Sequence, residues 1–160
     1  MGNAILGGWS TNWILTLYSG QPQTIGCTRA TTAGLGCDAL LTGQPLYPAN
    51  QTINQFYNPA AFANPPVATT IGQTDFAPLG GAGTQVTGPS FRQLDLSLFK
   101  SFKPSEGTRL EFRTEVFNLT NTPSFNAPGS LDFTNPNNFA VITSTRNFAR
   151  QIQFALKFYW

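Results

Sequence analysis

Glu111 and Glu115 are the residues whose type and spacing most suggest catalysis, because acid–base hydrolysis of glycosides needs a pair of carboxyl groups. Both lie in a segment with the alternation of a β-strand, where a separation of four residues corresponds to roughly 13 Å. A catalytic pair needs roughly 5–9.5 Å. Arg109 and Arg113 alternate with the two glutamates and keep them ionised. We therefore interpret the four residues as structural charges, expect no catalytic residue and rank an enzyme last among the possible functions.

Cysteine and histidine usage restricts the metal and redox chemistry of the chain. The sequence contains no histidine, which removes the commonest general base and the commonest metal ligand. Cys27 and Cys37 alone cannot form a structural zinc site. Their spacing fits a local disulfide that closes a surface loop in an oxidising compartment, and two unrelated thiols are the alternative. We expect neither a metal nor a cofactor.

The composition argues against several classes of protein. Only 10% of the 160 residues are charged, against about 25% in a typical soluble domain. The net charge is +2, and the basic residues form no patch that would predict nucleic-acid binding. No apolar run approaches the roughly 18 residues of a membrane helix. The first residues lack the features of a secretion signal, so any export signal is expected upstream of this chain.

Four segments alternate apolar and polar residues with the period of two that is typical of β-strands. The clearest is the last, in which Ile152, Phe154, Leu156, Phe158 and Trp160 occupy every second position. We predict strands at about 9–19, 91–102, 109–119 and 150–160. Each is roughly 10–12 residues long, which exceeds the usual soluble strand of about 5–6 and matches the about 9–11 of a tilted membrane strand. The sequence therefore predicts an all-β, antiparallel meander of about four membrane-type strands.

The connections between these segments are strongly unequal in length. Residues 103–108 contain Pro, Ser and Gly and predict a hairpin turn, whereas 20–90 and 120–149 are long and lack sustained periodicity. Outer-membrane barrels combine short turns on one side with long loops on the outside. We therefore interpret residues 1–160 as the C-terminal fragment of a larger transmembrane β-barrel with outer loops 20–90 and 120–149.

Charges and aromatic rings allow two interpretations each. Arg109, Glu111, Arg113 and Glu115 share one face of a predicted strand. In a barrel they would line the polar lumen, and in a soluble sandwich they would form a solvated outer face.

Phe56, Tyr57, Phe62 and Phe76 lie in the first long loop. We expect them to pack the loop against itself, with contact to a ligand such as a glycan as the alternative.

The alternation also predicts how the second and third strands pair. Leu94, Leu96 and Leu98 must share a face with Leu110, Phe112 and Val116, so even-numbered residues must lie opposite even-numbered residues. The turn then contains an odd number of residues. A loop at 104–108 pairs Lys103 with Arg109 and Ser97 with Glu115, and it avoids placing Asp95 opposite Glu115. We prefer this register.

Two longer runs resemble a known family. The run Arg150-Gln-Ile-Gln-Phe-Ala-Leu-Lys-Phe-Tyr-Trp160 is similar to the terminal strand of outer-membrane barrels, although Ala155 stands where glycine is usual. The run Leu110-Glu-Phe-Arg-Thr-Glu-Val-Phe-Asn-Leu-Thr-Asn-Thr-Pro-Ser-Phe125 resembles the penultimate strand of TonB-dependent receptors. The likeness is greatest to Oar-like receptors with a carboxypeptidase-regulatory-like domain, which are abundant in Acidobacteria. Shorter similar runs are Gly7-Gly-Trp9, Ser19-Gly-Gln-Pro22, Asp95-Leu-Ser-Leu-Phe-Lys100 and Phe139-Ala-Val-Ile-Thr-Ser-Thr-Arg146.

The resemblance implies a barrel of about 22 strands with a plugged lumen, located in the outer membrane of a Gram-negative bacterium, for uptake of a large substrate. It implies contact with outer-membrane lipid, with the rest of the receptor barrel and plug, and with TonB only through an N-terminal part that is absent here. Phe158 and Trp160 correspond to the signal that the barrel-assembly machinery reads. A free-standing extracellular β-sandwich, acting as an adhesin or glycan-binding protein, is the alternative function.

Overall fold

The computed structural model describes residues 6–28, 37–67, 70 and 86–160, and the chain divides into two compact units. The first unit contains the described residues up to Tyr18, together with Phe91–Ser124 and Thr145–Trp160. The second contains the described parts of Ser19–Ser90 and Phe125–Ser144. A short 3-10 turn, η1 (Pro59–Ala61), lies in the second unit. No helix within the described ranges has the length and hydropathy that a membrane crossing requires.

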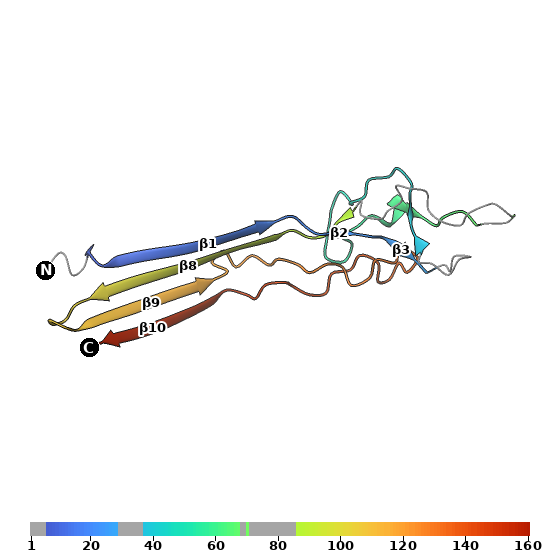
Figure 1. Ribbon diagram of the computed structural model, residues 1–160. Coiled ribbons are helices and arrows are strands. Elements are labelled where there is room, and N and C mark those ends of the chain that lie inside the picture. Colours follow the sequence, from blue (N-terminus) through green and yellow to red (C-terminus); the bar gives the residue numbers. More distant parts are fainter. Residues whose placement is uncertain (1–5, 29–36, 68–69, 71–85) are drawn as a thin grey trace. The chain divides into compact units, whose positions relative to one another are not determined.

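The first unit is a four-stranded sheet of long antiparallel strands (Figure 1). Its strands are β1 (Trp9–Tyr18), β8 (Phe91–Phe102), β9 (Arg109–Phe117) and β10 (Gln151–Tyr159). Their spatial order β1-β8-β9-β10 is also their order along the chain. The all-β antiparallel meander predicted from the alternation of residues is therefore confirmed.

Strand boundaries agree with the expected ones to within one or two residues. The bounds of β8 are those expected, and β10 is shorter by one residue at each end. The largest difference is at β9, which ends at Phe117 and not at Leu119. Asn118 adopts a φ of 52°, in the left-handed region that asparagine tolerates better than most residues. This conformation turns the backbone out of the strand.

The pairing of β8 with β9 follows the preferred register. Leu96 lies opposite Val116, Ser97 opposite Glu115, and Phe99 opposite Arg113. Asp95 is thus not placed across from Glu115. The pairing ends at Phe102 and Leu110, one step before the Lys103–Arg109 pair that we expected.

A compact turn joins β8 to β9. Gly107 has a φ of 80°, which only glycine adopts without strain. The backbone N–H of Thr108 donates to the Ser105 carbonyl at 3.2 Å, and the backbone N–H of Ser105 donates to the Thr108 hydroxyl at 3.2 Å. The two hydroxyl groups lie 2.8 Å apart. These reciprocal bonds hold the hairpin closed.

The second unit consists of three two-stranded ladders, which are labelled in part in Figure 1. They are β2 (Pro22–Gln23) with β7 (Val86–Thr87), β3 (Gly26–Cys27) with β4 (Cys37–Asp38), and β5 (Leu40–Leu41) with β6 (Phe62–Ala63). A strand of two residues leaves no periodic signal in the sequence. The described parts of the long connections therefore contain regular structure that their composition did not indicate.

The ladders enclose a hydrophobic core of their own. Tyr57, Ile25 and Val86 are fully buried there, beside Ala39, Ala61, Phe62, Phe139 and Ala140. The Tyr57 hydroxyl donates to the Gln23 side-chain oxygen at 2.6 Å, and burial raises the pKa of Tyr57 well above its usual range. Residues from both long connections thus contribute to one core.

Candidate functional site

One face of the four-stranded sheet is almost continuously apolar. The register places odd-numbered residues of β1 on the same face as even-numbered residues of β8, β9 and β10. The face is formed by Trp9, Thr11, Trp13, Leu15 and Leu17 from β1, Leu94, Leu96, Leu98 and Phe102 from β8, Leu110, Phe112, Thr114 and Val116 from β9, and Ile152, Phe154, Leu156 and Phe158 from β10. Phe154 is 68% exposed and Leu156 is 66% exposed. This is a large apolar surface that the chain does not cover.

The charged residues of the apolar face lie near its two borders and are both cations. Arg92 is exposed at the start of β8, and Lys100 lies close to the other end of the same strand. Only 5% of Lys100 is exposed. Its ammonium group donates to the Gly7 carbonyl oxygen and lies 4.9 Å from the centre of the Trp9 ring. Lys100, a charged residue at an even-numbered position of β8, is thus shielded by an aromatic ring and a carbonyl.

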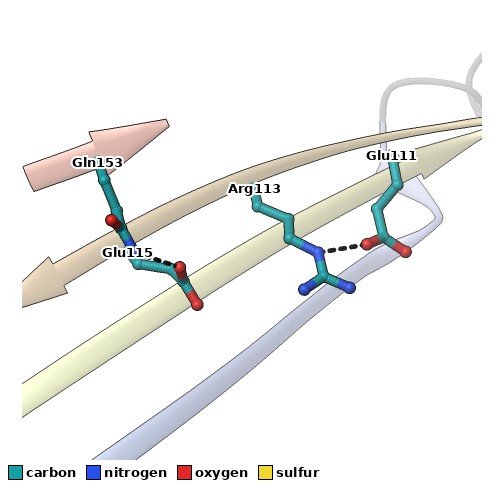
Figure 2. A network of polar contacts seen from close by, with 4 residues as sticks. All are labelled: Glu111, Arg113, Glu115 and Gln153. Atoms are coloured by element: carbon teal, nitrogen blue, oxygen red, sulfur yellow. Dashed lines mark hydrogen bonds and ion pairs between the residues drawn. The ribbon is translucent and has the colours of Figure 1, made fainter. Parts of the chain in front are cut away.

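The opposite face carries all the acidic residues of the four strands, which are Asp95, Glu111 and Glu115. Arg109 and Arg113 lie on this face too, so the structure brings together the four charges singled out in the sequence. Arg113 Nε donates to Glu111 Oε1 at 2.5 Å (Figure 2). Gln153 donates from β10 to Glu115 Oε2 at 2.7 Å (Figure 2).

Aromatic rings extend this polar network across the strands. The guanidinium carbon of Arg113 lies 5.0 Å from the centre of the Phe99 ring, which belongs to its register partner on β8. The guanidinium carbon of Arg109 lies 4.2 Å from the ring of its partner Tyr159. Lys157 lies opposite Glu111. Glu111 is therefore paired with Arg113, and Glu115 is paired with Gln153.

A buried asparagine connects the end of β9 to the start of β10. Asn118 is 3% exposed, and its side-chain amide donates to the carbonyls of Phe148 at 2.9 Å and Thr122 at 3.3 Å. Its backbone N–H donates to Asp95 Oδ1 at 2.8 Å. The side-chain oxygen of Asn121 accepts from the backbone N–H of Arg150 at 3.0 Å.

We call Asn118 and Asn121, with the bonds just described, the asparagine clasp. The sequence pattern does not predict the clasp, because Phe148 and Arg150, its partners beside β10, are about thirty residues away from the asparagines. The signal was present only as the Asn118-Leu-Thr-Asn121 spacing after a strand. Both asparagines have positive φ values, 52° for Asn118 and 49° for Asn121. Asparagine both tolerates this conformation and supplies the side-chain bonds.

The cysteines and the terminal aromatic residues lie in different units. Cys27 and Cys37 are register partners in the β3–β4 ladder and are joined by a disulfide, with Cα atoms 5.1 Å apart. Phe158 belongs to the apolar face, and Trp160 follows β10 and is 92% exposed. The rings of these two residues are stacked with centroids 5.9 Å apart.

The aromatic residues of the long connection pack against one another, as we expected. Phe56 and Tyr57 meet edge to face with centroids 5.1 Å apart, and Phe62 meets Phe139 at 5.8 Å. Phe76 lies outside the described residues. Among the described residues, no group of three or more His, Cys, Asp or Glu side chains is arranged to hold a metal ion.

Long strands with one uncovered apolar face and one charged face define a membrane-type β-sheet. The chain belongs to the family described as the outer membrane beta barrel domain, whose model matches residues 1–153. It is thus an outer-membrane β-barrel protein. No curated protein and no solved structure gives a significant match to the chain.

Proposed function

We propose that this chain forms the barrel wall and outer loops of a TonB-dependent receptor that takes up a large substrate across the outer membrane of a Gram-negative bacterium. The observation that carries the proposal is the separation of the two sheet faces. In a barrel wall the apolar face contacts lipid and the charged face lines the lumen. The alternative, a soluble sandwich, would bury its apolar face against a second sheet, whereas Phe154 and Leu156 are exposed here.

The positions of the cations on the apolar face support this orientation. Arg92 and Lys100 are eight residues apart on β8, which corresponds to roughly 27 Å along a strand. A strand tilt of about 40° shortens that distance to roughly 20 Å across the bilayer, close to the apolar band of about 25 Å in such barrels. The two cations would then lie near the two borders of the apolar band, where the exposed Arg92 can meet headgroup phosphates and Lys100 is covered by Trp9 and the Gly7 carbonyl.

The narrower assignment to a TonB-dependent receptor rests on the likeness of the penultimate and terminal strands to that family. The asparagine clasp gives a physical reason for the Asn-Leu-Thr-Asn spacing that contributes to the likeness. Phe158 and Trp160 remain our candidates for the barrel-assembly signal, and the second unit supplies the outer loops.

Two experiments test the wall and the transport separately. Single nitroxide labels at Leu156 and Lys157, introduced into the full-length protein without native cysteines, should differ in accessibility. The label at Leu156 should collide mainly with oxygen in lipid, and the label at Lys157 mainly with a water-soluble nickel reagent. Equal exposure of both labels to the nickel reagent would contradict a membrane wall.

The transport proposal predicts that deletion of the gene and deletion of tonB abolish uptake of the same nutrient. Growth of the two strains on a panel of large glycans and peptides measures this. A panel in which the two deletions never share a defect would count against a TonB-dependent receptor and leave the membrane wall unaffected.

A further inference from the structure

A pocket of about 230 Å³ opens on the polar face of the first unit. Its walls include Phe91 and Gln93 from the start of β8, Phe117 from the end of β9, and Gln151 from the start of β10. These strand residues are all odd-numbered and therefore belong to the charged face. Arg146 completes the pocket from the segment that precedes β10.

The Arg146 side chain is held in place by aromatic residues. Its Nη1 donates to the Tyr18 hydroxyl at 3.2 Å, and the guanidinium carbon lies 5.7 Å from the centre of the Tyr18 ring. The Tyr18 ring is stacked on Phe91, with centroids 4.8 Å apart and an angle of 9° between the planes. A guanidinium group fixed in this way loses little rotamer entropy when it binds a ligand.

The backbone around Arg146 is fixed as well. Its N–H donates to the Ser124 carbonyl at 2.6 Å. The neighbouring Asn147 accepts from the Ser124 N–H at 2.8 Å and donates to the Thr122 carbonyl at 3.0 Å. The pocket wall is therefore built into the same region as the asparagine clasp.

The charge of Arg146 has no acidic partner in the part of the chain that the structure describes. The ion pair found among the described residues is Arg113 with Glu111. Asp95 bonds to two residues of the pocket wall, because it accepts hydrogen bonds from the Gln93 side chain at 3.0 Å and from the Asn118 N–H at 2.8 Å. A preorganised cation beside aromatic walls and an amide is suited to a negatively charged group with an apolar body.

We propose that this pocket binds a carboxylate carried on a six-membered ring, as the anchoring group of the transported substrate. The guanidinium group of Arg146 would receive the carboxylate, and Phe91 and Phe117 would contact the ring. A cavity of about 150 Å³ accepts benzene, so the observed volume admits one such ring and its carboxylate. It is smaller than the roughly 300–1,000 Å³ of a site for a whole drug-sized ligand. The placement of the pocket in the lumen rests on the proposed function.

The test uses the full-length protein in detergent micelles and ligand-detected saturation-transfer NMR. Benzoate is compared with benzyl alcohol, and galacturonate with galactose, so that each pair differs in the carboxylate. Wild-type protein should bind at least one of the two acids at least about tenfold more tightly than its neutral counterpart. The pair that shows this preference identifies an aromatic or a sugar acid.

Two variants assign the preference to the pocket. Arg146→Gln should weaken binding of the preferred acid by about tenfold or more, and Arg146→Lys should retain part of it. Arg92→Gln is the matched control, because it removes an arginine at the same end of β8 from the opposite face, and it should leave the affinity unchanged.

Binding of the neutral compounds as tight as that of the acids would overturn the proposal, as would unchanged affinity in Arg146→Gln. Failure of both acids to bind wild-type protein would do the same. The amount of each protein in the outer-membrane fraction is measured in parallel. A correctly inserted protein that binds neither acid contradicts only the pocket, whereas a protein absent from that fraction contradicts the proposed function.

Discussion

The side-chain amide of Asn118 donates to the Phe148 carbonyl at 2.9 Å, so a residue just beyond β9 is bonded to one just before β10. Replacement of Asn118 by Ala should destabilise the protein by about 2 kcal/mol, because the Phe148 and Thr122 carbonyls lose the amide that donates to them and alanine adopts positive φ less readily than asparagine. Urea unfolding of the full-length protein in lipid vesicles, followed by tryptophan fluorescence, measures the loss.

The Asn118→Gly variant separates the two causes. Glycine loses the same side-chain bonds but adopts positive φ without strain. It should therefore be more stable than Asn118→Ala by about 1 kcal/mol. Identical unfolding midpoints for wild type and Asn118→Ala would show that the clasp does not contribute to stability.

An arginine introduced on the apolar face should destabilise the inserted protein, whereas an arginine introduced on the opposite face should be tolerated. Leu156→Arg places a cation on the face proposed to contact lipid and should cost about 2–4 kcal/mol if the residue lies near the bilayer midplane. Gln153→Arg lies on the other face of the same strand, opposite Glu115, and should be tolerated. The amount of heat-modifiable protein in outer-membrane fractions compares the two, and equal loss in both variants would contradict the assignment of faces.

The terminal aromatic residue should matter for assembly. Deletion of Trp160 from the full-length protein should lower its level in the outer membrane, because Phe158 and Trp160 are the proposed assembly signal. Quantitative immunoblotting of membrane fractions measures the level. Deletion of a residue from the Lys103–Thr108 turn would not serve as a control, because it would shift the pairing register of β8 and β9. Trp160→Phe, which keeps an aromatic end, is the matched control. Unchanged levels after deletion would argue against the signal.

The disulfide should be detectable in the exported protein. Trypsin cuts after Arg29, between Cys27 and Cys37, so digestion of the denatured, unreduced protein should leave two peptides joined by the bond. Mass spectrometry before and after reduction reveals the pair. Alkylation of both cysteines without prior reduction would contradict the bond. Because the bond lies within the second unit, the Cys27→Ser/Cys37→Ser variant should reach the outer membrane at the wild-type level.

Acidification should weaken the second unit through Asp132. Hydrogen bonds from Thr134 and from Thr28 lower the pKa of Asp132. A carboxyl group whose pKa is lowered in the folded state stabilises the fold at pH values above its ordinary pKa of about 3.9. This stabilisation is lost as the pH falls through the lowered pKa. Thr134→Val should raise the pKa of Asp132 towards the ordinary value. NMR titration of carboxyl-labelled aspartate measures the change, and Thr28→Val should produce a smaller one. An unchanged pKa in both variants would contradict this cause.

The alternation of residues predicted the sheet but not the folding of the connections. The requirement that Leu96 and Val116 share a face, together with the avoidance of an Asp95–Glu115 pair, predicts the observed β8–β9 register. The bond between Arg146 and Tyr18 joins residues 128 positions apart, and the two-residue ladders of the second unit have no period to detect. Local patterns report which face a side chain occupies, whereas these contacts depend on how distant segments return to one another.

Backbone bonds at Ser124 also separate the excursion between β9 and β10 from the four-stranded sheet. The Arg146 N–H donates to the Ser124 carbonyl and the Ser124 N–H donates to the Asn147 side chain, which closes the chain on itself at the points where the excursion departs and returns. Residues 125–144 can then be regarded as a cassette whose attachment points are maintained by the strands and not by the cassette. Exchange of this segment for a different one would alter the core of the second unit, to which it contributes Phe139 and Ala140, and the four long strands of the first unit would keep their register.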